Sequence, residues 1–102
     1  MKFLHVGIPT KEVKGEEVYV KDLKVYCTSP EKHPYSVEYV RFESCSSLPE
    51  ILKVQPHIAY KVDSIEEATK DADEVLVEPF KVGNAIITFI IKDNLIIELC
   101  QI

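Results

Sequence analysis

Several features that mark common classes of protein are missing from this chain of 102 residues. Lysine and arginine are outnumbered, 12 against 17 aspartates and glutamates, which gives a formal net charge of −5. Because an acidic surface repels phosphate backbones, nucleic acid is not expected as a partner. The sequence also has no glycine-rich phosphate loop, no Ser/His/Asp order for nucleophilic catalysis and no basic patch. What is left is one acidic domain that is long enough to fold alone.

Cysteine and long apolar runs are scarce as well. The three cysteines are Cys27, Cys45 and Cys100; their number is odd, their spacing is wide and no Cys-x-x-Cys occurs, which excludes a disulfide framework and a cysteine zinc site. The apolar run over residues 86–91 is broken by Thr88, so no segment is expected to span a membrane. Reduced thiols and an N-terminus without a signal-peptide core predict a cytoplasmic protein.

The features that are present begin with two histidines. "FLHVGIPT" and "QPHIAYKV" each place a histidine before alternating small and apolar residues, which is the period of a β-strand. His5 and His57 lie 52 positions apart, about half of the chain. This spacing indicates a duplicated unit.

The strand and helix patterns support the duplication. The second half predicts a strand at 57–62, a helix at 63–74 with Ser64 and Glu67 as a capping box, a strand ending at Pro79, and strands at 84–92 and 94–102 joined by a "KDN" hairpin turn. The first half predicts strands at 2–8, 23–29 and 35–44. In place of the helix it has a loop at 10–22, either without regular structure or with a short extended piece. Ser47 is predicted to cap a turn of helix between the halves. We therefore expect a single domain, 1–102, with half-modules at 1–46 and 56–102.

Glu98 is the first candidate for chemistry. In the strand "LIIELCQ", Ile97 and Leu99 suit the face that a helix covers, so Glu98 should point to the opposite face. A carboxylate among apolar residues is costly to bury without a partner. A metal ion or another cation would satisfy it.

The two histidines supply further candidates. If a pseudo-twofold axis relates the halves, His5 and His57 can meet near it, and the counterpart of Glu98 should be Glu43 or Glu38. Two imidazoles and two carboxylates make a divalent-metal site with positions open for water or substrate. Each residue also has a simpler interpretation: surface histidines, an edge-strand charge at Glu98 that discourages aggregation, and a surface ion pair between Glu43 and Arg41.

The segments "LHVGIPT", "HIAYKVDSIEEA" and "IIELCQ" together resemble the glyoxalase / bleomycin-resistance / extradiol-dioxygenase superfamily, also called vicinal oxygen chelate. The resemblance implies an α+β fold in which paired βαβββ modules form an incomplete barrel around a metal or ligand site. Here the first module would lack or shorten its helix. Because that leaves one sheet face exposed, a homodimer is expected.

The resemblance also implies a ligand set and a reaction type. The ligands would be His5, His57, Glu98 and Glu43, although the register of "VEYVRFES" leaves Glu43, Glu38 and Val40 open for the fourth position. A divalent Zn, Ni, Co or Mn ion would act as a Lewis acid on a small substrate with adjacent oxygen donors, and a carboxylate, Glu43 or Glu98, would move the proton. This is lyase or isomerase chemistry.

Two other functions fit the same residues. A metal-free protein of the bleomycin-resistance type would sequester a small molecule in a cavity lined by Tyr39, Arg41, Tyr60 and Phe89. A general α+β interaction module would place the two histidines far apart.

Overall fold

The computed structural model describes every residue from Met1 to Ile102. The chain forms two compact units, each of which contains its own set of paired strands. The N-terminal unit contains His5–Pro56, and the C-terminal unit contains His57–Ile102 together with the first four residues, Met1–Leu4. No helix is long and apolar enough to cross a membrane.

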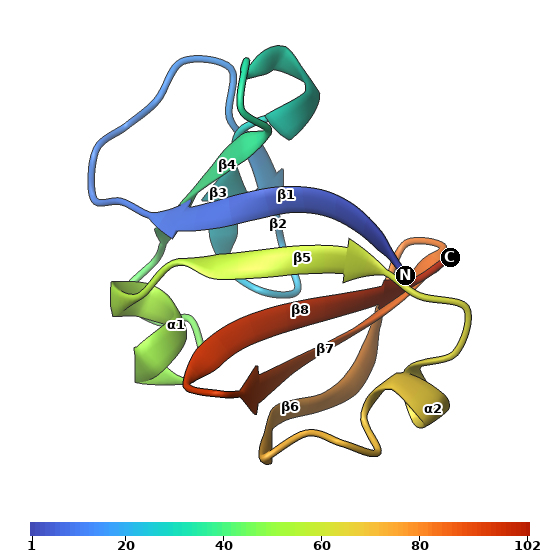
Figure 1. Cartoon of the computed structure of the whole chain (residues 1–102). Coiled ribbons are helices and arrows are strands. Elements are labelled where there is room, and N and C mark those ends of the chain that lie inside the picture. Colours follow the sequence, from blue (N-terminus) through green and yellow to red (C-terminus); the bar gives the residue numbers. More distant parts are fainter. The chain divides into compact units, whose positions relative to one another are not determined.

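The N-terminal unit contains three whole strands, the larger part of a fourth and two short helices (Figure 1). Strand β1 (Lys2–Pro9) pairs in parallel with β4 (Val37–Phe42), which pairs antiparallel with β3 (Val25–Cys27), which pairs antiparallel with β2 (Val18–Val20). A 3₁₀ turn, η1 (Pro30–Lys32), precedes β4, and helix α1 (Glu50–Val54) follows it. The predicted loop at 10–22 contains no helix, as expected, but its residues 18–20 form the short strand β2.

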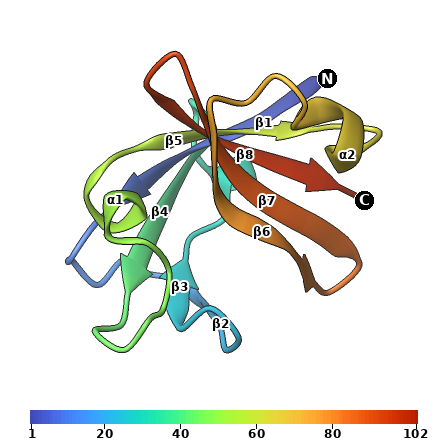
Figure 2. The same ribbon diagram turned by 90° about the horizontal axis from the view of Figure 1, so that it is seen from below.

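The C-terminal unit repeats this arrangement of strands. Strand β5 (His57–Lys61) pairs in parallel with β8 (Leu95–Gln101), which pairs antiparallel with β7 (Ala85–Lys92), and β7 pairs antiparallel with β6 (Glu74–Val82). Figure 2 shows β6, β7 and β8 side by side. In both units the first strand therefore lies beside the last, and the α+β class with a mixed sheet is confirmed. The incomplete barrel stays a prediction.

The β7–β8 hairpin follows from its turn residues. Asp93 and Asn94 both have positive φ angles, 52° and 65°, which is the conformation of a type I′ turn. Aspartate and asparagine tolerate this conformation better than other non-glycine residues. The Asp93 N–H also donates to the carboxylate of Asp73 at 2.9 Å, which ties the turn to the start of β6. The predicted hairpin is confirmed.

Helix α2 (Ile65–Ala68) is shorter than the predicted helix at 63–74. Ser64 does cap it, accepting a hydrogen bond from the Glu67 N–H at 3.2 Å, a contact that contributes about 1 kcal/mol. The Thr69 N–H still donates to the Ile65 carbonyl, and the backbone then tightens into i→i−3 turns. The Lys70 N–H donates to the Glu67 carbonyl at 3.3 Å and the Ala72 N–H to the Thr69 carbonyl at 3.1 Å before the chain enters β6. The predicted cap at Ser47 is wrong, because α1 has Pro49 at its N-cap with no side-chain hydrogen bond.

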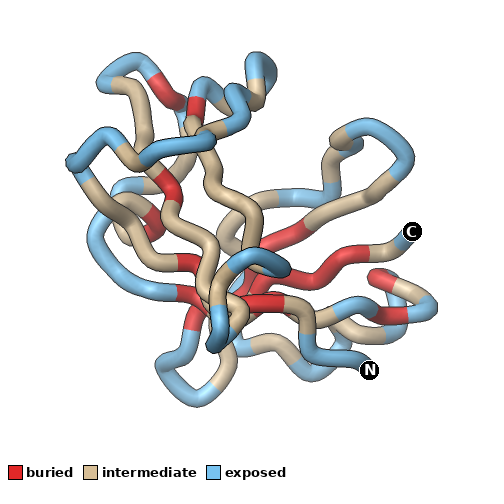
Figure 3. The backbone as a smooth tube through the Cα atoms, turned by 90° about the horizontal axis from the view of Figure 1, so that it is seen from above, coloured by how far each residue is buried: buried red, intermediate tan, exposed pale blue.

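The core of the C-terminal unit lies between α2 and one face of its sheet. Val62, Ile65, Ile90 and Leu99 form the buried cluster, and Ile97 and Ala68 pack against it. Figure 3 shows the buried segments along the strands, with the chain end after β8 exposed. Leu99 and Ile97 thus face α2, as predicted, and the alternation of the strand turns Glu98 to the other face.

Candidate functional site

Glu98 lies beside His57 within the C-terminal unit. The register of β5 and β8 places Ala59 opposite Glu98, so His57, two residues earlier, projects from the same face. The carboxylate Oε1 is 3.0 Å from the imidazole Nε2, and the two side chains are only 11% and 6% exposed. A buried carboxylate needs such a partner, because an isolated charge is costly away from water.

An aromatic ring holds the imidazole from another side. Phe89 lies opposite Glu98 in the β7–β8 ladder, and its ring meets that of His57 edge-on, with centroids 5.3 Å apart and planes at 90°. This is a favoured geometry for two rings. Phe89, predicted to contact substrate, is therefore a neighbour of the His57–Glu98 pair.

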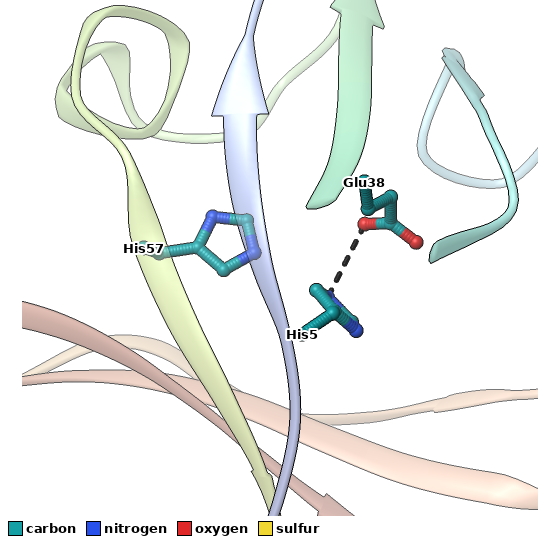
Figure 4. Close-up of side chains that lie close together, drawn as sticks. All are labelled: His5, Glu38 and His57. Atoms are coloured by element: carbon teal, nitrogen blue, oxygen red, sulfur yellow. Dashed lines mark ion pairs between the residues drawn. The ribbon is translucent and has the colours of Figure 1, made fainter. Parts of the chain in front are cut away.

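The N-terminal unit holds a second pair of the same kind. His5 Nε2 lies 3.3 Å from Glu38 Oε1, and Figure 4 marks this contact with a dashed line. The side chain of His5 is 11% exposed and that of Glu38 is 20% exposed. The β1–β4 register pairs Gly7 with Glu38, so His5 again stands two residues before the partner of the glutamate.

The two units thus build their pairs from equivalent positions. In each, the first strand supplies a histidine, and the residue two positions later faces a glutamate on the parallel last strand. By this register the counterpart of Glu98 is Glu38, one of the two alternatives left open by the sequence. Val40, the third residue considered for that position, is a buried residue that pairs with Pro9 and Cys27.

Glu43, the residue chosen from the sequence as the fourth ligand, has different neighbours. It follows the end of β4 and accepts a hydrogen bond from the Tyr19 hydroxyl, which lowers the pKa of the Glu43 carboxyl. The Cys45 thiol also donates to it at 3.6 Å. The sequence favoured Glu43 over Glu38, whereas the structure brings Glu38 to His5.

Arg41 forms an ion pair with Glu17, a residue that the sequence analysis did not identify. Its Nε and Nη2 atoms donate to the two oxygens of Glu17 at 3.0 and 2.9 Å, and its guanidinium lies over the ring of Tyr26 at 4.1 Å. The hydrogen bonds from Arg41 lower the pKa of Glu17. Glu17 in turn accepts the backbone N–H of Lys14 at 3.3 Å. Arg41 therefore holds the loop between β1 and β2.

The two tyrosines predicted to line a cavity differ in their surroundings. Tyr60 packs against the core beneath α2 and meets Phe3 edge-on at 6.2 Å. Tyr39 lines a cavity of the N-terminal unit, described below. No signal in the sequence connected Lys14, which lies 4.4 Å above the Tyr39 ring, with that cavity.

Comparison with known proteins adds to the fold only. No protein-family model matches this chain. No curated protein sequence matches it either. The crystal structure of a hypothetical protein, BH1468, from Bacillus halodurans C-125 is similar over 99% of this chain and 94% of that chain, with a TM-score of 0.66 and 15% sequence identity. At this identity the similarity concerns the fold.

Proposed function

We propose that the two His–Glu pairs, His5 with Glu38 and His57 with Glu98, together bind one divalent metal ion. The observation that carries the proposal is the matched register, which gives each unit one imidazole and one carboxylate at equivalent positions. The resemblance to the glyoxalase superfamily in the sequence supports the same ligand types, with Glu38 in place of Glu43.

The chemistry of these side chains fits a metal such as Zn²⁺, Ni²⁺, Co²⁺ or Mn²⁺. Imidazole nitrogen and carboxylate oxygen are ordinary ligands of these ions, and four protein ligands leave positions for two substrate oxygens in an octahedral shell. The near-complete burial of His57 and Glu98 also fits, because a dry site strengthens the attraction between carboxylate and cation.

The reaction we propose is isomerisation or lyase chemistry on a small molecule with adjacent oxygen atoms. A bound divalent ion would supply Lewis acidity to such oxygens. The Glu98 carboxylate is the proposed proton acceptor, since it projects from the same sheet face as His57. The ring of Phe89 fixes the plane of His57 and excludes water from one side of it.

The test is a calorimetric titration of untagged, chelator-treated protein with each of the four ions. We expect one ion per chain. Changing a ligand should weaken binding by more than about tenfold, because the loss of a group that merely supports a ligand costs about 10–100-fold. His57→Gln and Glu98→Gln test the C-terminal pair, and Glu38→Gln tests the N-terminal pair.

Glu43→Gln is the matched control, because it removes a carboxylate five positions from Glu38 on the same segment. It should bind the ion as the unchanged protein does. Binding of two ions per chain, with each variant losing only the ion bound by its own His–Glu pair, would overturn the proposal of one shared metal site. Absence of binding by all four ions would overturn the metal proposal and leave the metal-free, ligand-binding alternative.

A further inference from the structure

The N-terminal unit has no α-helix over the sheet face that α2 covers in the C-terminal unit. Since Glu38 corresponds to Glu98 in register, Tyr39 corresponds to Leu99. Leu99 is buried in the cluster beneath α2. The connection between β1 and β2 contains no helix, so Tyr39 has no such cover.

A cavity of about 240 Å³ occupies this face. Val37 and Tyr39 of β4 and Thr28 at the end of β3 line it. Thr28 is fixed to Tyr39 by two hydrogen bonds, from the Thr28 N–H to the Tyr39 carbonyl at 3.1 Å and from the Tyr39 N–H to the Thr28 hydroxyl at 2.9 Å. The volume lies below the roughly 300–1,000 Å³ of drug-sized sites, so a small ligand fits it best.

Two lysines line the cavity, and each is paired with an exposed carboxylate. Lys14 Nζ lies 3.1 Å from Glu12 Oε2, and Lys32 Nζ lies 3.2 Å from Glu16 Oε2. Because exposed ion pairs of this kind are weak, the carboxylate of a ligand can replace these partners. The Lys14 ammonium lies 4.4 Å above the Tyr39 ring, so a charge and an aromatic face are presented together. His33 meets the edge of the same ring, with centroids 6.1 Å apart.

The loop that carries Lys14 is anchored. Its backbone N–H donates to Glu17, and Glu17 is held by the two hydrogen bonds from Arg41. Glu17 has a side chain only 9% exposed, so this anchor is one of the better-buried ion pairs of the protein. The position of Lys14 over Tyr39 is therefore built into the fold of the unit.

We propose that this cavity binds a small aromatic carboxylate, whose ring contacts Tyr39 and Val37 and whose carboxylate meets Lys14 and Lys32. Side chains of a strand alternate between the two faces of the sheet, so Tyr39 projects away from the face of His5 and Glu38. The site is thus separate from the proposed metal ligands and needs no metal.

The experiment uses benzoate as the probe, on the full chain in the presence of chelator, with two-dimensional amide NMR spectra as the readout. We expect saturable shifts at Gly15, Ser29 and His33, all of which line the cavity. Benzyl alcohol, which lacks the charge, and acetate, which lacks the ring, should each bind more weakly than benzoate.

Three variants locate the site. Lys14→Gln should weaken benzoate binding about fivefold, the scale of one partly exposed charge pair. Glu17→Gln should weaken it as well, by releasing the loop that carries Lys14. Lys70→Gln is the matched control, because Lys70 is an exposed lysine paired with Glu67 in the C-terminal unit, and it should bind benzoate normally.

The outcomes that overturn the proposal are shifts that do not saturate, shifts confined to other residues, and equal affinity for Lys14→Gln and Lys70→Gln. Binding by acetate equal to that of benzoate would also overturn it, since the ring would then contribute nothing. Because the chelator removes divalent ions, none of these outcomes depends on the proposed metal site.

Discussion

Replacing Leu99 by alanine tests whether α2 and the sheet form the core of the C-terminal unit. Leu99 is 2% exposed and belongs to the cluster with Val62, Ile65 and Ile90. The change removes three carbon atoms, each of which contributes about 0.8 kcal/mol when buried, or about 2.4 kcal/mol in total. A cavity term adds to this, so we expect a loss of about 3 kcal/mol, within the roughly 2–5 kcal/mol found for buried leucines.

The assay is urea unfolding followed by circular dichroism, together with a thermal scan. The midpoint should fall with an unchanged m-value, because the surface exposed on unfolding hardly changes. The melting temperature should fall by roughly 12–24 °C, since 1 kcal/mol corresponds to roughly 4–8 °C in a domain of this size.

Leu95→Ala, on the same strand, is the matched control. Leu95 is 52% exposed, so its truncation should cost less than about 1 kcal/mol. A loss below about 1 kcal/mol for Leu99→Ala, or equal losses for the two variants, would refute the assignment of the buried face of β8.

Two further predictions concern titratable groups outside the core. The hydrogen bond to Glu43 raises the pKa of Tyr19 from 10.0 to about 12. The contact therefore stabilises the fold below pH 10.0 and is lost as the pH rises through about 12. In an absorbance titration, Glu43→Gln should move this ionisation back toward 10.0, and a Tyr19 that ionises near 10.0 in the unchanged protein would contradict the contact. Burial, with a smaller contribution from Glu98, raises the pKa of the Cys100 thiol, whereas Cys45 is exposed. Iodoacetamide at mildly alkaline pH should therefore alkylate Cys45 well before Cys100 in the folded protein, as mapped by mass spectrometry, and equal rates would contradict this burial.

Much of the fold was predictable because its signals are local. The alternation of apolar residues identified β1, two runs of apolar residues identified β7 and β8, and "KDN" identified the hairpin between these last two strands. The length of α2 was not predictable in this way. Its sequence continues to favour a helix after Ala68, but the Asp73 carboxylate accepts a hydrogen bond from the Asp93 N–H, and the Asp73 N–H donates to the Ile91 carbonyl. Contacts with a distant turn therefore compete with helix propensity.

The candidate site shows the same limit. The histidines are 52 positions apart, and the same offset applied to Glu98 leads to Ser46, close to Glu43. The register instead relates Glu98 to Glu38, an offset of 60, because the first half has a shorter connection before its second strand and shorter second and third strands. Thr28 and Thr88 are also 60 positions apart. Thr28 lies beside Tyr39, which follows Glu38, and Thr88 lies beside Leu99, which follows Glu98. The sequence therefore showed which residue types could form the site. Which glutamate lies beside which histidine could be determined only from the register of the paired strands.

Strand β6 limits how copies of this chain could associate. It is the outermost strand of its unit, and its ladder with β7 shifts register between Val75 and Val77 and again between Val77 and Phe80. Pro79, within the second shift, has no N–H to offer a neighbouring strand. An irregular edge of this kind is a poor template for another β-strand, which protects against amyloid-like stacking. A homodimer formed at this edge would have to join through side chains rather than through a continuous intermolecular sheet.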